Sequence, residues 1–383
     1  AICVGEGEYP LLELVQSLEK GAGIDKIKNI HTKEGGRVIK NELRPLVENL
    51  DELPFPAREV YDKYPSFQKN PTKHIIASRG CPFNCGYCYG HLLKKIYQGK
   101  GTFVRFRSAE NVIRELEATK AKYPLRTVFF DDDVLILDRR WLYDFLKQYK
   151  ERVQVPFICN VQAQVTTDET ARRMKEAGCF RVSMGLETGD EGLRRTLLNK
   201  NVTDKQIIES AHNLRKNGIK ILTNNMMCLP GETLEHALKT IYLNIKIKTE
   251  YPWCSILQPY PGTEIEKRAV EKGLMKPKDH ASFSSTFFKD SPLKQKNINE
   301  LVNLQKFFYL AIKFPVLIPL IKVLVRFSFL RGLYHAIFLV TFALRYKAAN
   351  RLTLFEIIQF GLKNLPLYVT RPSRSRPIKP HSF

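Results

Sequence analysis

The sequence predicts an α/β fold whose main part is built from parallel strands joined by helices. Short apolar runs alternate with helical segments from residue 73 to residue 273. Several helical segments begin at Ser, Asp or Thr and several end at Gly, as helix capping favours. Alternation of this kind gives parallel strands with right-handed crossovers. Six such strands make a partial barrel or an open sheet, and both bind ligands at the carboxyl ends of the strands.

Each element can be placed along the chain. The predicted strands are residues 73–78, 126–131, 155–161, 179–186, 219–227 and 253–258. The predicted helices are residues 108–123, 139–151, 168–178, 190–200, 204–218, 233–248 and 263–273. A cluster of cysteines follows the first strand directly. This cluster should therefore lie at the carboxyl end of that strand, where such folds bind ligands.

Residues 1–70 predict the end of one domain and a linker. A strand end and an acidic, glycine-rich turn precede an amphipathic helix with apolar residues on one face. These residues are Leu11, Leu14, Val15 and Leu18. A proline-rich segment follows, which should be extended. Because the first strand begins in mid-element, we expect this chain to be a fragment of a longer protein.

Eight cysteines are few for 383 residues, and they form no disulfide framework. Three of them lie within residues 81–88, and the other five are scattered in mainly apolar surroundings. This usage predicts a protein of the reducing cytosol.

The clustered cysteines have the spacing C-x3-C-x2-C and offer three thiolates to one metal centre. If His91 is a fourth ligand, Cys81, Cys85 and Cys88 would complete a structural zinc site. Alternatively, the three thiolates bind three irons of a [4Fe–4S] cluster and leave the fourth iron open. The spacing alone does not decide between the two, although zinc knuckles usually lie in small independent modules.

The stretch "SRGCPFNCGYC", residues 78–88, resembles the signature loop of the radical S-adenosylmethionine (SAM) superfamily, in which an aromatic residue precedes the third cysteine. The resemblance implies a partial (β/α)6 barrel, a [4Fe–4S] cluster on the three cysteines, and SAM bound at the open iron. In that family, one electron cleaves SAM to methionine and a 5′-deoxyadenosyl radical, which takes a hydrogen atom from the substrate. Tyr87 would line the cofactor site.

The same resemblance implies SAM contacts at other strand ends. Asp132, or the backbone beside it, would lie near the SAM amino group; the alternative is a solvated acidic turn or a helix cap at Asp131 or Asp133. Glu187 would be the family's acidic SAM contact, because a carboxylate after an apolar strand needs a partner. The remaining candidates are Asn225, from the pair Asn224 and Asn225, and Gln258, near the adenine.

Two positions depart from the family's pattern. Cys228 stands where many relatives have Gly, and Gln162 and Gln164 stand where relatives often carry a charge pair. No general acid or base can be named, because hydrogen abstraction by a radical needs none.

"CVGEGEYPLLELVQSLEKG" and "LDELPFPAR" resemble the seam between a cobalamin-binding domain and a radical SAM barrel. This seam implies a Rossmann-like cobalamin domain whose last turn and helix lie in residues 1–70. Many members of this subclass transfer methyl groups to unactivated carbon, so methyl transfer is the leading hypothesis. Other members catalyse cyclisations or rearrangements, which stay open as alternatives.

Residues 291–383 form a distinct, basic region. It carries 15 Lys and Arg against Glu300 and Glu356, which is +13 of the chain's net charge of +22. The pattern is helical and apolar, but no uncharged run reaches the 20 or so residues of a spanning helix. Two hypotheses stay open: a helical cap over the barrel mouth, or helices at a membrane surface that favour a hydrophobic substrate. Residues 370–383 should be disordered.

The charge also raises the question of partners. A zinc-stabilised nucleic-acid-binding protein and an RNA-modifying radical SAM enzyme are the alternatives, but no nucleic-acid module is recognisable and the tail is not a small β-barrel. We therefore expect a small-molecule substrate and no nucleic acid. The basic stretch "LKKIYQGK", residues 93–100, predicts a solvated face that could guide an acidic electron donor such as a flavodoxin or ferredoxin.

Overall fold

The computed structural model describes residues 1–277, 283–284, 286–350, 353, 355, 358 and 361–362. The chain forms two compact units. Unit 1 is Ala1–Asn160 with Glu176–Gly178, and unit 2 is Val161–Lys175 with Cys179–Phe383. The domain boundaries predicted near residues 70 and 290 remain a prediction. So does the expected disorder of residues 370–383, which lie outside the described residues.

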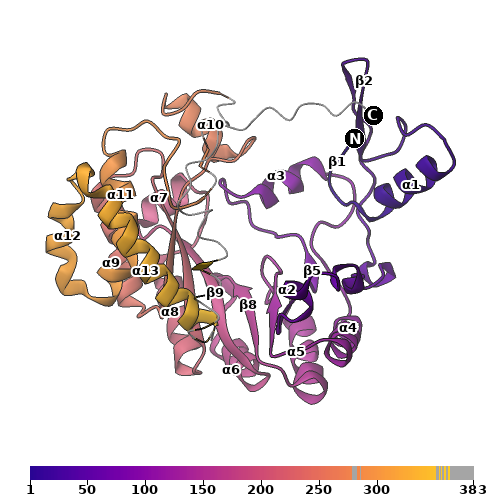
Figure 1. Cartoon of the computed structure of the whole chain (residues 1–383). Coiled ribbons are helices and arrows are strands. Elements are labelled where there is room, and N and C mark those ends of the chain that lie inside the picture. Colours follow the sequence, from indigo (N-terminus) through magenta and orange to yellow (C-terminus); the bar gives the residue numbers. More distant parts are fainter. Residues whose placement is uncertain are drawn as a thin grey trace. The chain divides into compact units, whose positions relative to one another are not determined.

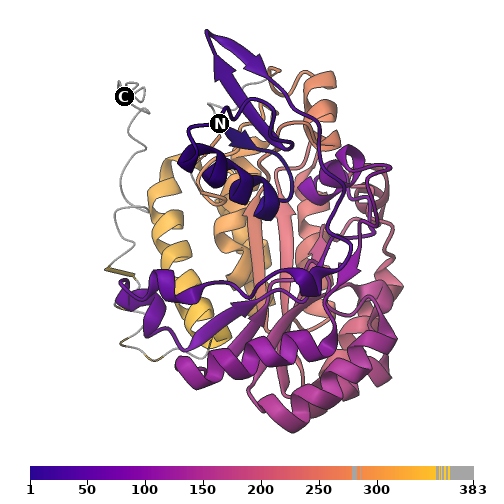
Figure 2. The ribbon, with the colours of Figure 1, turned by 90° about the vertical axis from the view of Figure 1, so that its right-hand side faces the viewer.

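Unit 1 begins with a small antiparallel sheet in the order β1-β2-β3 and one helix. These elements are β1 (Ile2–Cys3), α1 (Glu8–Glu19), β2 (Ile30–Glu34) and β3 (Arg37–Ile39). Figure 2 shows β2 and β3 as a hairpin. The proline-rich linker holds only short elements: η1 (Leu50–Glu52), η2 (Arg58–Tyr61) and α2 (Pro65–Gln68). The predicted strand, turn and helix are therefore present, and the linker is mainly irregular.

The rest of unit 1 alternates strands and helices. Its elements are β4 (Thr72–Ile75), β5 (Ser78–Arg79), α3 (Tyr89–Ile96), β6 (Arg105–Phe106), α4 (Ala109–Lys122), β7 (Thr127–Phe130), α5 (Arg139–Gln148), η3 (Tyr149–Val153) and β8 (Phe157–Val161). Helices α4 and α5 pack side by side (Figure 2). Phe130 of β7 makes edge contacts with Phe145, Tyr149 and Phe157. This aromatic core fixes the helix-covered face of the strands.

Unit 2 continues the same alternation and then becomes helical. Its elements are η4 (Ala163–Val165), α6 (Asp168–Glu176), β9 (Cys179–Glu187), α7 (Glu191–Thr196), α8 (Asp204–Lys216), β10 (Lys220–Met227), α9 (Leu234–Lys246), β11 (Tyr251–Ile256), α10 (Glu264–Glu271), α11 (Ile298–Lys313), η6 (Pro315–Leu317), α12 (Ile318–Leu324), η7 (Ser328–Leu330) and α13 (Arg331–Asn350). Every strand and helix predicted between residues 73 and 273 is present at its expected place.

The main sheet has six strands in the order β11-β10-β9-β8-β7-β4. The pairs β4·β7, β7·β8, β9·β10 and β10·β11 are all parallel. The predicted α/β class with six parallel strands is thus confirmed. In a parallel sheet all carboxyl ends share one edge, and the residues that follow each strand are therefore the candidates for a site.

Side-chain caps start the helices where the sequence places them. Ser108, Asp138, Thr203, Thr233 and Thr263 each accept a hydrogen bond from a backbone N–H of the first turn. Each cap satisfies a donor that the helix leaves unpaired. The capping residues therefore set the lengths of the strand-to-helix loops.

The C-terminal helices of unit 2 pack as a group with α9 (Figure 1). Their core residues include Leu301, Leu304 and Phe308 of α11, which lie with Met227 and Ile256 from the sheet in one buried cluster. The helical nature predicted for this region is confirmed up to Asn350, within the described residues. Among the described residues, no helix has the length and hydropathy that crossing a membrane would require.

Candidate active site

The three clustered cysteines lie on the loop between β5 and α3. Cys85 is buried, Cys81 is half-buried, and Cys88 is exposed as the N-cap of α3. The pKa of the Cys81 thiol is raised to about 11, first by burial and then by the charges of Asp133, Cys85 and Cys88. A cationic metal centre bound at this loop would instead favour the thiolate form.

The donor chemistry of this loop suits iron. No three His, Cys, Asp or Glu side chains in the described part of the chain are arranged to hold one metal ion. A [4Fe–4S] cluster has a different requirement, because each thiolate binds a separate iron. Residues 81–88 offer three thiols and no carboxylate, which is the donor set that such clusters use. Tyr87, on the same loop, is half-buried.

Two local contacts shape the cysteine loop. The Lys94 ammonium donates hydrogen bonds to the carbonyl of Pro82 at 3.0 Å and to Asn84 Oδ1 at 3.2 Å. Lys94 therefore holds the loop between the first two cysteines, and is more than the solvated cation that the sequence predicted. Gly80 has φ +86°, and a Cβ there would lie 2.1 Å from the carbonyl oxygen of Phe103. Only glycine fits this approach.

Glu6 anchors the base of the cysteine loop. Its carboxylate pairs with Arg79 at 3.0 Å and with the buried Arg105 at 2.8 Å, and it accepts a hydrogen bond from the Val47 N–H. Burial raises the pKa of Glu6, but the bonds from Arg105, Val47 and Arg79 outweigh it, so the pKa is lowered overall. No local sequence pattern indicates this clamp, because its members are up to 99 residues apart.

Asp132 is buried and holds the chain that leads into the cysteines. Its carboxylate accepts hydrogen bonds from the Ala77 N–H at 3.1 Å and from the Ser78 hydroxyl. Burial raises its pKa to about 6, against the effect of these hydrogen bonds. Asp132 is thus not part of a solvated turn, and its carboxylate already has donors from the protein. Neither Asp131 nor Asp133 is the N-cap of α5, which is Asp138.

A histidine that the sequence analysis did not single out lies at the same strand ends. His74 Nδ1 is 2.8 Å from Asp131 Oδ2, and the imidazole stacks on Phe129 with ring centroids 5.2 Å apart. His74 and Asp131, together with Asp132, line a cavity of about 820 Å³ in unit 1. Period-two alternation along β4 and β7 is the signal that could have found this pair.

The remaining predicted contacts, Glu187, Asn225 and Gln258, belong to unit 2. Glu187 ends β9 with φ +69°, and its carboxylate is 3.4 Å from the ammonium of the buried Lys200. The partner that this carboxylate requires is therefore Lys200, which the sequence analysis missed. A Cβ at Gly185 would lie 2.3 Å from Glu187 Oε1 and 3.0 Å from Lys200 Nζ. Gly185 thus makes room for the ion pair.

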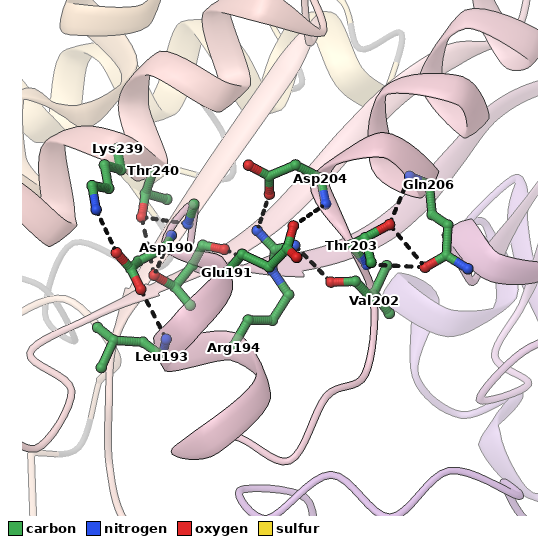
Figure 3. A network of polar contacts seen from close by, with 12 residues as sticks. Asp190, Glu191, Leu193, Arg194, Val202, Thr203, Asp204, Gln206, Lys239 and Thr240 are labelled. Carbon is green, nitrogen blue, oxygen red and sulfur yellow. Dashed lines mark hydrogen bonds and ion pairs between the residues drawn. The ribbon is translucent and has the colours of Figure 1, made fainter.

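The loop after Glu187 is fixed by a fully buried arginine (Figure 3). The guanidinium of Arg194 donates to the carbonyls of Thr188 at 3.0 Å and Val202 at 2.7 Å, and to Asp204 at 2.6 Å. Asp190 caps α7 through the Leu193 N–H and pairs with Lys239 at 2.7 Å, as Figure 3 also shows. This network ties both ends of the segment that carries Glu187 and Lys200.

The two asparagines of β10 point to opposite faces of the sheet. Asn225 is buried, donates to the Trp253 carbonyl at 2.8 Å, and accepts from Asn244 of α9 at 2.9 Å. Its side chain is therefore engaged on the helix-covered face. Asn224 is half-buried and lies on the opposite face, because successive side chains of a strand alternate between the two faces of the sheet. The cofactor contact predicted at Asn225 stays a prediction, and Asn224, on the other face of the strand, is the alternative candidate.

Cys228 follows strand β10, and Gln258 lies just after strand β11. Gln258 is buried and donates to the Asp290 carbonyl at 3.0 Å, while its Oε1 has no hydrogen-bond partner among the described residues. A buried acceptor of this kind suits a donor on a ligand. Cys228 adopts φ +67°, which explains why a glycine is favoured at this position.

Comparisons with known proteins agree with this architecture. Residues 75–243 match the model of the Radical SAM superfamily. An uncharacterized methyltransferase PH0819 from Pyrococcus horikoshii is 31% identical over 279 residues, which is 72% of this chain and 59% of that protein. The hopanoid C-3 methylase of Methylococcus capsulatus is 24% identical over 276 residues, 68% of this chain and 48% of that protein. The chain thus spans about half the length of these relatives.

Solved structures share the fold. The radical SAM methyltransferase TsrM from Kitasatospora setae, bound to tryptophan and a SAM analogue, has a TM-score of 0.58 at 16% identity, over 71% of this chain and 54% of that chain. The cobalamin-dependent SAM radical enzyme OxsB, with aqua-cobalamin and SAM bound, has a TM-score of 0.53 at 21% identity, over 70% and 38%. The resemblance read from the cysteine loop is confirmed, since residues 75–243 of this chain match the radical SAM superfamily of enzymes.

Proposed function

We propose that this chain binds a [4Fe–4S] cluster through Cys81, Cys85 and Cys88 and cleaves SAM reductively, as part of a cobalamin-dependent enzyme that methylates an unactivated carbon. The cluster, when bound, supplies the electron and the open iron for SAM. The observation that carries the proposal is the cysteine loop: three neighbouring thiols at a strand end within the matched family region.

The protein's own part in unit 1 is to hold the thiols in place. Glu6 fixes Arg79 and Arg105 below the loop, Asp132 fixes Ala77 and Ser78, and Lys94 fixes the segment between Cys81 and Cys85. A loop held at its base and middle loses less conformational entropy when the metal binds. The half-buried Tyr87 would pack against the bound SAM.

In unit 2, we assign SAM contacts to Glu187, Asn224 and Gln258. The carboxylate of Glu187 can accept a bond from the cationic or hydroxyl groups of SAM while Lys200 compensates its charge. The unpartnered Oε1 of Gln258 can accept a hydrogen bond from an adenine amino group. Asn224 offers an amide on the sheet face opposite α9.

Methyl transfer and cobalamin are supported by two independent features. The relatives are named as methyltransferases, and the solved structures include cobalamin-dependent enzymes. In addition, α1 exposes Leu11, Val15 and Leu18. An exposed apolar stripe on a helix suits packing against a further domain. We propose that this domain is the cobalamin-binding one.

The proposed partners follow from the chemistry. The reaction needs a small-molecule substrate, for which a hydrophobic one is our proposal, and a one-electron donor such as a flavodoxin or ferredoxin. Lys95 is exposed in the last turn of α3, seven residues after Cys88, and it could attract an acidic donor. We place the enzyme in the cytoplasm, with peripheral contact to a membrane.

The test is anaerobic reconstitution, followed by iron and sulfide analysis and an assay for 5′-deoxyadenosine with SAM and a strong reductant. We expect about four irons per chain and 5′-deoxyadenosine formation, both lost in Cys85→Ala. Cys159→Ala is the matched control, because Cys159 is a buried cysteine of β8. One tightly held zinc and no SAM cleavage would refute the proposal. Methylated product with added methylcobalamin would separate methyl transfer from cyclisation or rearrangement.

A further inference from the structure

The segment from η6 to the start of α13 is apolar on both its inward and outward faces. Its inward residues lie in the core of unit 2; they are Ile318, Ile321 and Val325. Its outward residues are exposed; they are Val316, Leu320, Val323, Phe327, Phe329 and Leu333. We call this second set the outward apolar face. A helix that is apolar all round is normally buried on all sides. We therefore expect another surface to cover the outward apolar face.

Helical spacing joins these residues into one surface. Val316, Leu320, Val323 and Phe327 follow steps of four, three and four residues, which place them on one side of α12 and its flanking turns. The rings of Phe327 and Phe329 lie 5.9 Å apart. The two short turns carry the most exposed side chains, with Val316 84% and Phe329 81% exposed. Single exposed apolar residues are ordinary, but a contiguous set marks an interaction site.

The charged residues of the helical stretch that carries this face are all positive. Residues 301–350 contain seven Lys and Arg and no Asp or Glu. Lys322 and Arg326 are exposed, and neither forms an ion pair within the described part of the chain. Cations that flank an apolar helix face can reach anionic headgroups while the apolar side chains enter the acyl boundary.

We propose that the outward apolar face, with Lys322 and Arg326, docks on the surface of an anionic lipid bilayer. A second copy of the chain fits this face less well. A symmetric dimer through it would bring Lys322 and Arg326 near their own copies, in a segment that has no acidic residue to compensate. A bilayer with anionic lipids supplies both the apolar layer and the negative charge. This inference stands apart from the proposed SAM chemistry.

Vesicle flotation of the reconstituted chain tests the proposal. We expect binding to phosphatidylcholine vesicles that contain phosphatidylglycerol, and weaker binding to phosphatidylcholine alone. Val316→Ser with Phe329→Ser should lower the partition coefficient about tenfold or more, because two apolar side chains lose their burial. Lys322→Glu with Arg326→Glu should lower it about fivefold or more per cation.

Two control variants make the same kinds of substitution on other surfaces of the protein. Leu11→Ser with Leu18→Ser removes two other exposed apolar residues, from α1, and Lys205→Glu with Lys246→Glu reverses two exposed cations of α8 and α9. Both controls should bind vesicles like the unchanged chain. Failure of the unchanged chain to float with anionic vesicles would overturn the proposal. A concentration-dependent dimer abolished by Val316→Ser would also overturn it, by assigning the face to a second copy. Iron content and SAM cleavage, measured in parallel, report on the proposed function separately.

Discussion

The strand end that carries the cysteines and the strand end that carries Glu187 are built in different ways. The cysteine loop is fixed at its base and middle, but its thiols range from buried to exposed, and burial, followed by the charges of Asp133, Cys85 and Cys88, raises the pKa of Cys81. The segment after Glu187 has its charges paired inside the protein, through Lys200 and the fully buried Arg194. In our proposal the first end is completed by the [4Fe–4S] cluster, whereas the second is preorganised by the protein alone.

The largest effect should come from removing Arg194. Arg194→Met leaves the carbonyls of Thr188 and Val202 without their donor and should lower the free energy of unfolding by about 3–5 kcal/mol. Urea denaturation measures this loss. Arg195→Met, in the next and exposed position of α7, should change stability by less than about 0.5 kcal/mol. Equal losses from both substitutions would show that the second end is not preorganised by this network.

Glu6→Gln should have the next largest effect, on the cysteine end. The variant leaves Arg105 buried without its carboxylate and should cost about 2–3 kcal/mol near neutral pH. Because the folded pKa of Glu6 is lowered below 4.5, its stabilisation is present above that pH and lost as the pH falls through the folded pKa. The stability difference from the unchanged chain should therefore shrink in acid. The exposed Glu19→Gln serves as the control, and a difference that grows in acid would contradict this assignment.

Glu187→Gln should separate cofactor binding from cluster binding. If Glu187 contacts SAM, the amide should weaken SAM binding about tenfold, since a charged hydrogen bond is lost. The iron content should stay the same, because the cysteine loop is untouched. Titration of the reconstituted protein with SAM, followed by the electron paramagnetic resonance signal of the reduced cluster, measures this. Unchanged SAM affinity would mean that Glu187 does not contact SAM and serves only as the ion-pair partner of Lys200.

The asparagine pair gives the most selective prediction. Asn225→Ala should cost about 1–3 kcal/mol of stability, because Asn244 and the Trp253 carbonyl lose a partner. Asn224→Ala should change stability by less than about 0.5 kcal/mol and should instead weaken SAM binding. Thermal unfolding and the same SAM titration separate the two. A reversed pattern would return Asn225 to the cofactor site.

The sequence was sufficient for the elements and their order, because capping residues and alternating apolar runs are local signals. It was also sufficient for the three cysteines, whose spacing is short. It could not identify Glu6, Lys94 or Lys200 as positioning groups, since each acts through contacts that only the folded chain brings together. Nor could the sequence decide between Asn224 and Asn225, because the face of a strand residue depends on register, and a one-residue shift reverses the face.

Hydrogen–deuterium exchange of the anaerobic chain, without metal and after cluster reconstitution, tests the difference between the two strand ends most directly. We predict that the amides of residues 81–91 become strongly protected on reconstitution, while those of residues 185–204 are already protected and change little. Protection of residues 185–204 that appears only after reconstitution would contradict the account, because the second end would then also depend on the metal.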